Sequence, residues 1–500
     1  MQQHSDQSEA QPVQNSNYRS RVVVQNGCSR TSTPKASPPA LYAASSQENS
    51  VTQEICAITQ SSSISSPYLA NKHCRLGMRQ LVAKTATIVF PLASQSFVDR
   101  LMLSAMKTPP LLYALLACFG SHNARRMTSP TSTSESERAT TLMFTNNAIS
   151  GLRAALARDS ATSKTFKTET LMTAMALCTN DVCNGNIDVF RMHLKAIRQM
   201  LPSYTNSLPS KNNRTSVTED SILNVYLMKW FAALDVSASL SLFTPHQHGD
   251  DHNEQRELAG FFDGNPTSDY WNKYKIFNLS EDFVVDDICG YSLNLVPIFS
   301  RIGNLARMQY ENLPINESSC DIDLRYDYAE VITGVTSSQS PDLIIQAQLL
   351  ESQLQNLPSP QISTTGIWTS EQHQLVEELR DTHPAFVHTA LLHLHRRVQL
   401  LPKYHPKVRN DVINILRVVQ NVLPFSPANV LLIWPLFSAG CETDRAEERA
   451  VVDERMSIMQ SLGMGNFTRG REALKRLWES GTALRWDVYL AKSGIDLVLF

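Results

Sequence analysis

The stretch Asn429–Glu442, NVLLIWPLFSAGCE, constrains the fold more than any other part of this sequence. Between Val430 and Ala439 only Ser438 is polar, so a helix formed here would be apolar on every face and would have to be buried. The stretch is shorter than the roughly 20 apolar residues that a membrane-spanning helix needs. We therefore expect a core helix around which other elements pack.

Two features of this stretch predict where its helix begins and ends. Proline has no backbone N–H, so the pair Trp434-Pro435 predicts either a kink or a first helical turn at this point. Gly440 is the residue type that most often ends a helix. We expect the helix to stop there.

Composition indicates an intracellular globular protein. The chain has 500 residues, enough for one large domain or two to three ordinary ones. Its net charge of −2 excludes a chain-wide attraction to nucleic acid or to an anionic membrane. The nine cysteines are scattered and odd in number, which favours reduced thiols in the cytosol or nucleus. We expect no signal peptide, because the start MQQHSDQSEAQ has no basic and apolar run.

The composition changes at about residue 66. Residues 1–66 are rich in Ser, Gln, Thr, Asn and Pro and contain no apolar periodicity longer than the run RVVVQ. Such a segment cannot bury enough apolar surface to fold, so we expect it to be disordered. From residue 67 onward apolar residues recur three and four positions apart, which is the helical period. We therefore expect one all-helical domain over residues 67–500.

Strand patterns are nearly absent from the chain. Alternation survives only in Val22–Val24 and in the ambiguous run FVVDD near residue 285. The sequence thus predicts an all-α fold. Because no fixed period of about 34 or 40 residues recurs, we expect an irregular multi-helix array, a solenoid-like bundle, rather than a regular repeat protein.

Periodicity and helix-breaking residues predict the individual helices. We expect Pro202 to stop one helix and the pair His383-Pro384 to interrupt another. Asp444 with Glu447 predicts a cap for a helix that ends near Gly463. The expected helices are 68–90, 96–106, 109–126, 137–158, 169–183, 187–201, 221–243, 288–310, 341–357, 370–401, 408–422, 429–440, 444–463, 468–479 and 486–500.

One loop, HQHGDDHNE, carries side chains of the types that bind divalent metal ions. The flanking sequence supplies no supporting partners for them, so we expect a solvated loop rather than a metal site. The residues concerned are His246, His248, Asp250, Asp251, His252 and Glu254.

Four histidines, His383, His388, His393 and His395, fall on one predicted helix. His388 and His395 are seven residues apart and can share a helix face, but no HExxH motif is present. We expect these histidines to be core or surface residues. Cys178 and Cys183 form no CxxC motif, and we expect them to pack in the core.

The densest positive segment contains Arg396 and Arg397, followed by Lys403, His405, Lys407 and Arg409. It could contact an acidic partner, but we expect a solvated helix end. No GxGxxG, P-loop, GxSxG or kinase motif occurs in the sequence. From the residues alone we therefore expect neither a catalytic site nor a cofactor site nor a metal site, and no enzymatic activity.

The segment LLIWPLFSAGCETDRAEERAVVDERMSIMQSLGMGNFTRGREALKRLWES resembles the fungal-specific transcription factor domain, in the branch whose helix reads roughly L-W-P-L-F-x-A-G-C-E. The resemblance extends in order through TPPLLYALLACFGSHNAR, the region around TLMTAMALCTNDVC, and DDICGYSLNLVPIFSRIGNLA, and covers about residue 85 to the end. It implies an all-helical regulatory domain of nuclear, zinc-cluster transcription factors. It also implies a structural signature that holds helices together: Trp434, Pro435, Leu436, Phe437, Gly440, Cys441 and Glu442.

The zinc cluster of that family has six cysteines that hold two zinc ions. The first 80 residues here contain only Cys28, Cys56 and Cys74, without a CxxC pair, so they do not match it. Three explanations stay open: the cluster was lost, an upstream exon is missing from the gene model, or the N-terminal region binds DNA in another way. Direct DNA contact is therefore undecided.

The resemblance implies a regulator of a fungal gene set, in a metabolic or secondary-metabolite pathway, that works with other transcription regulators. A homodimer and a small-molecule effector bound between helices are further implied partners, and no membrane is. The alternative is a helical scaffold or co-regulator that has no DNA binding of its own and depends on partners.

Overall fold

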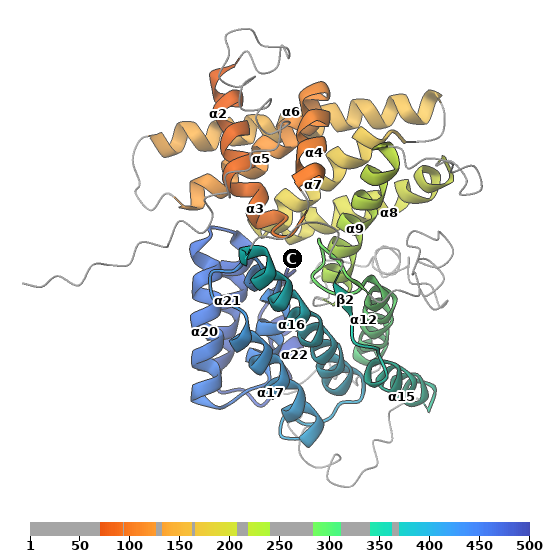
Figure 1. Cartoon of the computed structure of the whole chain (residues 1–500), viewed down its shortest axis with the longest axis vertical. Helices are drawn as coiled ribbons and strands as arrows, with labels where there is room; N and C mark the ends of the chain where they lie inside the picture. Colours follow the sequence, from red (N-terminus) through yellow and green to blue (C-terminus); the bar gives the residue numbers. More distant parts are fainter. Residues whose placement is uncertain are drawn as a thin grey trace, which may run out of the picture. The chain divides into compact units, whose positions relative to one another are not determined.

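The computed structural model describes residues 71–93, 95–126, 133–162, 166–207, 219–240, 284–311, 341–362 and 370–500. These residues are mostly helical, which confirms the all-α fold predicted from periodicity (Figure 1). The segment 1–66, predicted to be disordered, and the histidine-rich loop at 246–254 lie outside the described residues.

The first group of helices ends at residue 240. Helix α5 packs against α6 and α7, and α7 also packs against α8. Every residue of α7 from Thr170 to Cys183 is buried, so α7 is a central helix of this group. The elements are α2 (Lys72–Gln80), the π-helical turn η2 (Leu81–Thr85), α3 (Ala86–Val89), α4 (Gln95–Lys107), α5 (Pro109–Arg126), α6 (Thr133–Thr162), α7 (Thr168–Asn184), α8 (Ile187–Ser207) and α9 (Glu219–Leu240).

The second group begins at residue 284. A pair of two-residue parallel strands joins its parts, β1 (Val284–Val285) and β2 (Gln361–Ile362), so the ambiguous run near residue 285 contains a short strand. The helices are η5 (Leu293–Leu295, 3-10), α12 (Val296–Glu311), α15 (Pro341–Gln355), α16 (Ser370–His393), η6 (Leu394–Val398, π-helical), α17 (Pro406–Asn421), α18 (Pro427–Leu431), α19 (Ile433–Cys441), α20 (Ala446–Ser461), α21 (Gly465–Ser480) and α22 (Trp486–Lys492).

Two prolines predicted to end or interrupt helices do neither. Helix α8 continues through Pro202 to Ser207, and α16 continues through Pro384 to His393. Packing beyond each proline outweighs the lost backbone hydrogen bond, since Tyr204 and Phe386 are buried just after them. The departure from α geometry in this region comes later, in the π-helical turn η6.

The apolar stretch Asn429–Glu442 forms two helices rather than one. Helix α18 ends at Leu431, and α19 begins at Ile433, which places Pro435 in the first turn of α19. This agrees with one of the two outcomes predicted for the Trp434-Pro435 pair. Every residue of α19 is buried, and the helix packs against α16, α17, α20 and α21.

Gly440 does not end helix α19, contrary to the prediction from sequence. The helix runs on to Cys441. A Cβ atom placed on Gly440 would lie 3.0 Å from both Leu474 Cδ1 of α21 and Val452 Cγ1 of α20. The glycine therefore serves close packing with these two helices.

Candidate functional site

Helix α19 carries its largest side chain, Trp434, into a cluster of rings. The Trp434 ring lies 5.3 Å from the Phe299 ring, 6.0 Å from the Phe386 ring and 5.1 Å from the His393 ring, between centroids. These partners come from α12 and α16, so one tryptophan joins three helices. Aromatic contacts of this kind add about 0.5–1.5 kcal/mol each to the free energy of burial.

The one polar residue within the predicted apolar run, Ser438, has a buried partner. His393 Nε2 and Ser438 Oγ are hydrogen-bonded at 2.9 Å. Burial, together with the nearby Arg397 guanidinium, lowers the pKa of His393 well below its ordinary value, so this imidazole is neutral. Ser438 is thus satisfied without introducing a charge beside α19.

An apolar cavity of about 80 Å³ lies at the N-terminal end of α19. Its walls come from both groups of helices and from the last two residues, which agrees with the position of the C-terminus between α3 and α16 (Figure 1). The lining includes Ile88 and Val89 of α3, Ala233, Val236, Ser237 and Leu240 of α9, Phe386 of α16, Val430, Leu431, Ile433 and Trp434, Asn466 and Phe467 of α21, and Leu499 and Phe500.

One polar side chain of the cavity wall is incompletely paired. Asn466 Nδ2 donates a hydrogen bond of 2.8 Å to the backbone oxygen of Phe500. Asn466 Oδ1 is buried and has no hydrogen-bond partner among the described residues. An unpaired buried acceptor costs about 1–3 kcal/mol, so a molecule that donates an N–H or O–H group here would recover that energy. Sequence reasoning missed Asn466, although it stands out as an amide between Gly465 and Phe467.

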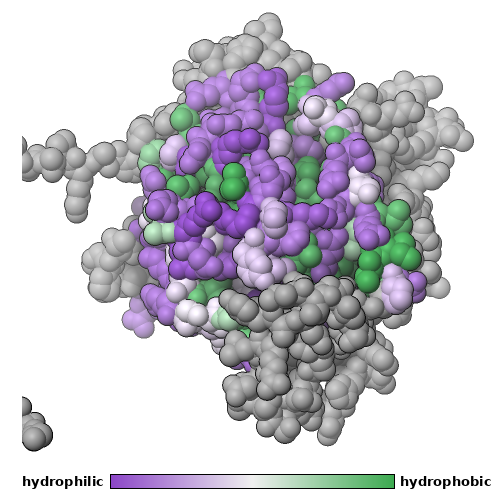
Figure 2. Space-filling model, turned by 90° about the horizontal axis from the view of Figure 1, so that it is seen from below, coloured by the Kyte–Doolittle hydropathy of each residue, from purple (hydrophilic) through white to green (hydrophobic). Residues whose placement is uncertain are grey.

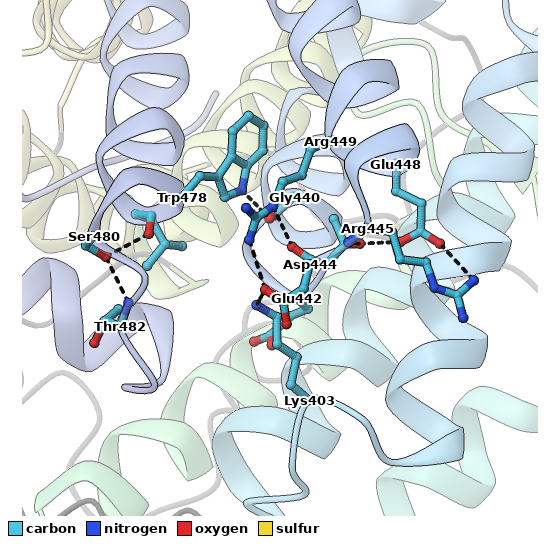
Figure 3. A network of polar contacts seen from close by, with 12 residues as sticks. Lys403, Gly440, Glu442, Asp444, Arg445, Glu448, Arg449, Trp478, Ser480 and Thr482 are labelled. Carbon is cyan, nitrogen blue, oxygen red and sulfur yellow. Dashed lines mark hydrogen bonds and ion pairs between the residues drawn. The ribbon is translucent and has the colours of Figure 1, made fainter. Parts of the chain in front are cut away.

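The C-terminal end of α19 is held by a polar network (Figure 3). Trp478 Nε1 of α21 donates a hydrogen bond of 2.9 Å to the Gly440 oxygen, which satisfies a carbonyl that the helix end leaves free. The Arg449 guanidinium lies 5.4 Å from the Trp478 ring centroid. Arg449 also donates to the Thr443 oxygen at 2.9 Å and to Asp444 at 2.9 Å.

Asp444 does not cap helix α20, contrary to the prediction from sequence. Its carboxylate accepts from Lys403 at 2.7 Å and from Arg449, as the dashed lines around Asp444 indicate in Figure 3. Thr443 makes the local hydrogen bonds instead. Its hydroxyl accepts a hydrogen bond from the Arg445 backbone N–H at 3.2 Å and donates one to Glu448. Helix α20 (Ala446–Ser461) therefore begins later than predicted, with Arg445 rather than Asp444 at its N-cap position.

Arg396 and Arg397 do not form a solvated helix end, contrary to the prediction. Both lie in the π-helical turn η6 and are buried. Arg396 Nε pairs with Glu442 Oε2 at 2.8 Å, and Arg397 Nε pairs with Asp487 Oδ2 at 3.2 Å. Burial acts to raise the pKa of Asp487, but Arg485 and Arg397 together lower it to about 2.

The later members of the positive segment lie at the surface and are paired. Lys407 Nζ lies 2.6 Å from Glu351 Oε1, and Arg409 Nη2 lies 2.6 Å from Glu448 Oε1. Lys403 pairs with Asp444. The segment is therefore largely neutralised by carboxylates from other parts of this chain.

The histidines of α16 and η6 have partners within the protein. His388 Nδ1 and His395 Nδ1 lie 3.0 Å and 2.7 Å from the two oxygens of Asp411, which confirms that this pair shares a face. His383 Nδ1 accepts a hydrogen bond from the Ser292 N–H at 3.2 Å, and burial lowers its pKa to about 4. Within the described ranges, no group of three or more His, Cys, Asp and Glu side chains is placed to hold a metal ion.

The face seen in Figure 2 is mostly hydrophilic, with separate small groups of hydrophobic residues. Exposed apolar side chains include Ile344, Ile345 and Leu349 on α15. Among the described helices, none combines the length and the apolar character needed to cross a membrane. The cavity beside Trp434 is therefore the feature best suited to receive a small molecule.

A family model described as the fungal-specific transcription factor domain matches residues 82–500. Searches of the curated proteins and of the solved structures return no match. The matched range contains α19, the cavity and the polar network described above.

Proposed function

Because the chain belongs to the family that carries the fungal-specific transcription factor domain, we propose that it regulates transcription of a fungal gene set in a metabolic or secondary-metabolite pathway. The family is one of transcription regulators, not of enzymes. We place its action in the nucleus and assign residues 67–500 to the regulatory domain. The match over residues 82–500 is the observation that carries this proposal.

The cavity beside Trp434 supports the further proposal that regulation uses a small effector. A volume of about 80 Å³ exceeds the space of one water molecule but is smaller than a cavity that holds benzene, about 150 Å³. The effector would be small and mainly apolar, with one N–H or O–H group directed at Asn466 Oδ1. A larger molecule would displace part of the wall, and such a shift between two packed arrangements is how helical domains are switched.

The first test measures transcription directly. The full chain, fused to a heterologous DNA-binding domain, is expressed in a fungal host with a reporter gene. We expect reporter expression to change severalfold relative to the DNA-binding domain alone. Chromatin immunoprecipitation of the untagged full chain should also enrich a limited set of promoters. No enrichment together with an unchanged reporter would refute the transcriptional role.

The second test addresses the effector with matched variants. Ser237 lines the cavity and Ser461 is exposed on α20, and each hydroxyl bonds a carbonyl of its own helix. Ser237→Leu should fill the cavity and abolish the thermal shift that a small-metabolite panel produces, while Ser461→Leu should leave that shift intact. A panel without any thermal shift, or equal behaviour of the two variants, contradicts the effector proposal but leaves the transcriptional role standing.

The alternative is a co-regulator or scaffold that reaches promoters through other transcription regulators. The three residues Cys28, Cys56 and Cys74 do not match a two-zinc cluster, so direct and partner-mediated recognition of promoters both stay open. Gel-shift assays with the purified full chain and promoter fragments recovered by immunoprecipitation separate the two cases. Binding by the purified chain alone supports direct recognition, and binding only after addition of nuclear extract supports the co-regulator.

A further inference from the structure

Cys118 of α5 and Cys183 of α7 face each other across the contact between these helices. Their thiols are hydrogen-bonded to each other, and both side chains are buried. The same pair of helices is joined next to them, where Asn184 Nδ2 donates to Ser121 Oγ at 3.2 Å. The two sulfur atoms are therefore held together by a packed and hydrogen-bonded interface.

Arg125 brings a positive charge to this thiol pair. It stands two turns after Cys118 on α5, where its Nε donates to the Gly463 oxygen at 2.9 Å and its Nη1 donates to Asn184. Its Nη2 is buried without a hydrogen-bond partner, and no carboxylate pairs with it among the described residues. Arg125 is half-buried, and a positive charge beside a cysteine favours the thiolate form of that cysteine.

The two sulfurs differ in acidity. The hydrogen bond from Cys183 and the charge of Arg125 hold the pKa of Cys118 below its ordinary value, although burial and the charge of Asp181 on α7 oppose this. The pKa of Cys183 is raised well above its ordinary value, first by that same hydrogen bond and then by burial. Of the two groups, Cys118 is therefore the more acidic, and Cys183 is the thiol that donates the hydrogen bond.

Both sulfurs border space that a small oxidant can occupy. Cys183 lines the cavity of about 80 Å³ beside Trp434. Cys118 lines a second apolar cavity of about 20 Å³ between α5, α9 and the π-helical turn η2. A space of this size holds one water-sized molecule, and hydrogen peroxide is only slightly larger.

We propose that Cys118 and Cys183 form a peroxide-reactive dithiol, in which Cys118 reacts with hydrogen peroxide and Cys183 then closes a disulfide that joins α5 to α7. The Cys118 sulfur attacks one peroxide oxygen, the O–O bond breaks, and a sulfenic acid and hydroxide result. The hydroxide takes up the proton that Cys118 had lost and becomes water.

The second step consumes the sulfenic acid. The Cys183 sulfur attacks the Cys118 sulfur, an S–S bond forms, and the S–O bond breaks. The departing hydroxide takes the Cys183 proton and leaves as a second water. Two thiols lose two electrons in total, and one hydrogen peroxide is reduced to two water molecules.

The Cys118–Cys183 disulfide would also affect the second group of helices, because α7 contacts α21. A Cβ atom on Gly465, the first residue of α21, would lie 2.7 Å from the Cys183 backbone oxygen, so the two backbones are in close contact. Arg125 holds the neighbouring Gly463 oxygen. The disulfide would tie α7 to α5 directly beside the contact of α7 with α21, so it would act on the packing around the Trp434 cavity.

The test oxidises the reduced, full-length protein with one equivalent of hydrogen peroxide. Remaining thiols are alkylated, and the peptides are analysed without reduction by mass spectrometry. We expect a Cys118–Cys183 cross-linked peptide as the main product. Cys178 is the internal control, because it lies on the same helix, bonds the Phe190 oxygen and has a pKa raised well above its ordinary value by burial. It should remain a thiol.

Variants assign the two roles. Cys183→Ser should leave a sulfenic acid at Cys118 that a dimedone probe traps, and Cys118→Ser should leave Cys183 unoxidised. Cys178→Ser should not change the yield of the cross-link. Oxidation spread over all cysteines, or Cys118 and Cys183 left as thiols after the treatment, would overturn the proposal. The wild-type peptide map decides the matter even where a variant does not fold.

The role of Arg125 has its own readout. Arg125→Gln should shift the pH profile of Cys118 oxidation upward, because at pH 7 the thiolate fraction falls about tenfold for each unit by which the pKa rises. The neighbouring Arg126 is exposed, so Arg126→Gln is the matched control and should leave the profile unchanged. If the two variants showed the same pH profile of Cys118 oxidation, Arg125 would have no role in setting the reactivity of Cys118.

Discussion

At the scale of single residues, we propose that the signature side chains on and after α19 hold helices together. Trp434 joins rings from α12 and α16, and Glu442 neutralises Arg396. Gly440 lets α20 and α21 approach. Each of these roles is a contact within the protein, so changes at these positions should first be visible in stability.

Trp434→Ala should destabilise the protein by about 3–5 kcal/mol, because a large buried ring is lost and its space is not refilled. Chemical denaturation of the full chain measures this change. Tyr404→Ala is the control, since Tyr404 is 59% exposed and surface substitutions cost about 0.5 kcal/mol or less. A Trp434→Ala protein with unchanged unfolding free energy and lost reporter activity would make Trp434 a functional contact instead.

Glu442→Gln should cost about 3–5 kcal/mol, because it leaves the Arg396 charge buried without its partner. Asp444→Asn removes a carboxylate two positions away that is 72% exposed in its pair with Lys403. That change should cost about 1 kcal/mol or less. Urea denaturation midpoints compare the two variants, and equal losses would contradict the assignment of a buried pair to Glu442.

Stability should depend on pH in two steps. Burial lowers the pKa of both His122 and His383 to about 4, so between pH 6.5 and 4 the unfolded state binds more protons than the folded state. The unfolding free energy should therefore fall as the pH falls through this window, by up to about 1.4 kcal/mol per pH unit for each histidine. Below pH 4, protonation of Asp487, whose pKa is about 2, should lower it further.

Denaturation of the full chain at a series of pH values measures these slopes. His383→Gln should reduce the slope in the upper window, where His122 still contributes, and leave the slope in the lower window unchanged. His73→Gln is the control, because His73 is exposed on α2. A slope in the upper window that is the same in wild type and in His383→Gln would show that His383 is not neutral in the folded state.

At the scale of elements, apolar periodicity predicted where helices form better than where they end. Both prolines named above remain inside helices because Tyr204 and Phe386 are buried beyond them. Gly440 remains inside α19 because two neighbouring helices need its missing side chain. At these positions, contacts between segments distant in sequence determine whether the helix continues. Local residue preferences do not contain that information.

Gly440→Ala sets two effects of similar size against each other. Alanine favours the helix by about 1 kcal/mol over glycine, while overpacking in a filled core costs about 1–3 kcal/mol. With Leu474 and Val452 atoms 3.0 Å from the new Cβ, we expect a net loss of stability. A double-mutant cycle with Val452→Ala should show favourable coupling between the two sites. A stabilised single mutant would contradict close packing at Gly440.

At the scale of the whole molecule, the all-α fold and the family could be predicted from the sequence, but the cavity could not. Its wall combines segments from Ile88 to Phe500, and no local pattern links these. The burial of Arg397 was missed for the same reason, because its partner Asp487 is 90 residues away. The shared face of His388 and His395 was predictable because a single helix sets it.

The position of Leu499 in the cavity wall has a consequence for biosynthesis. Val89 and Leu499 line the same cavity, yet roughly 410 residues separate them. At a translation rate of about 5–20 residues per second, the apolar surface of α3 is synthesised tens of seconds before Leu499, which later packs near it. We therefore expect chaperones to bind the nascent chain at this surface until residue 499 has been made.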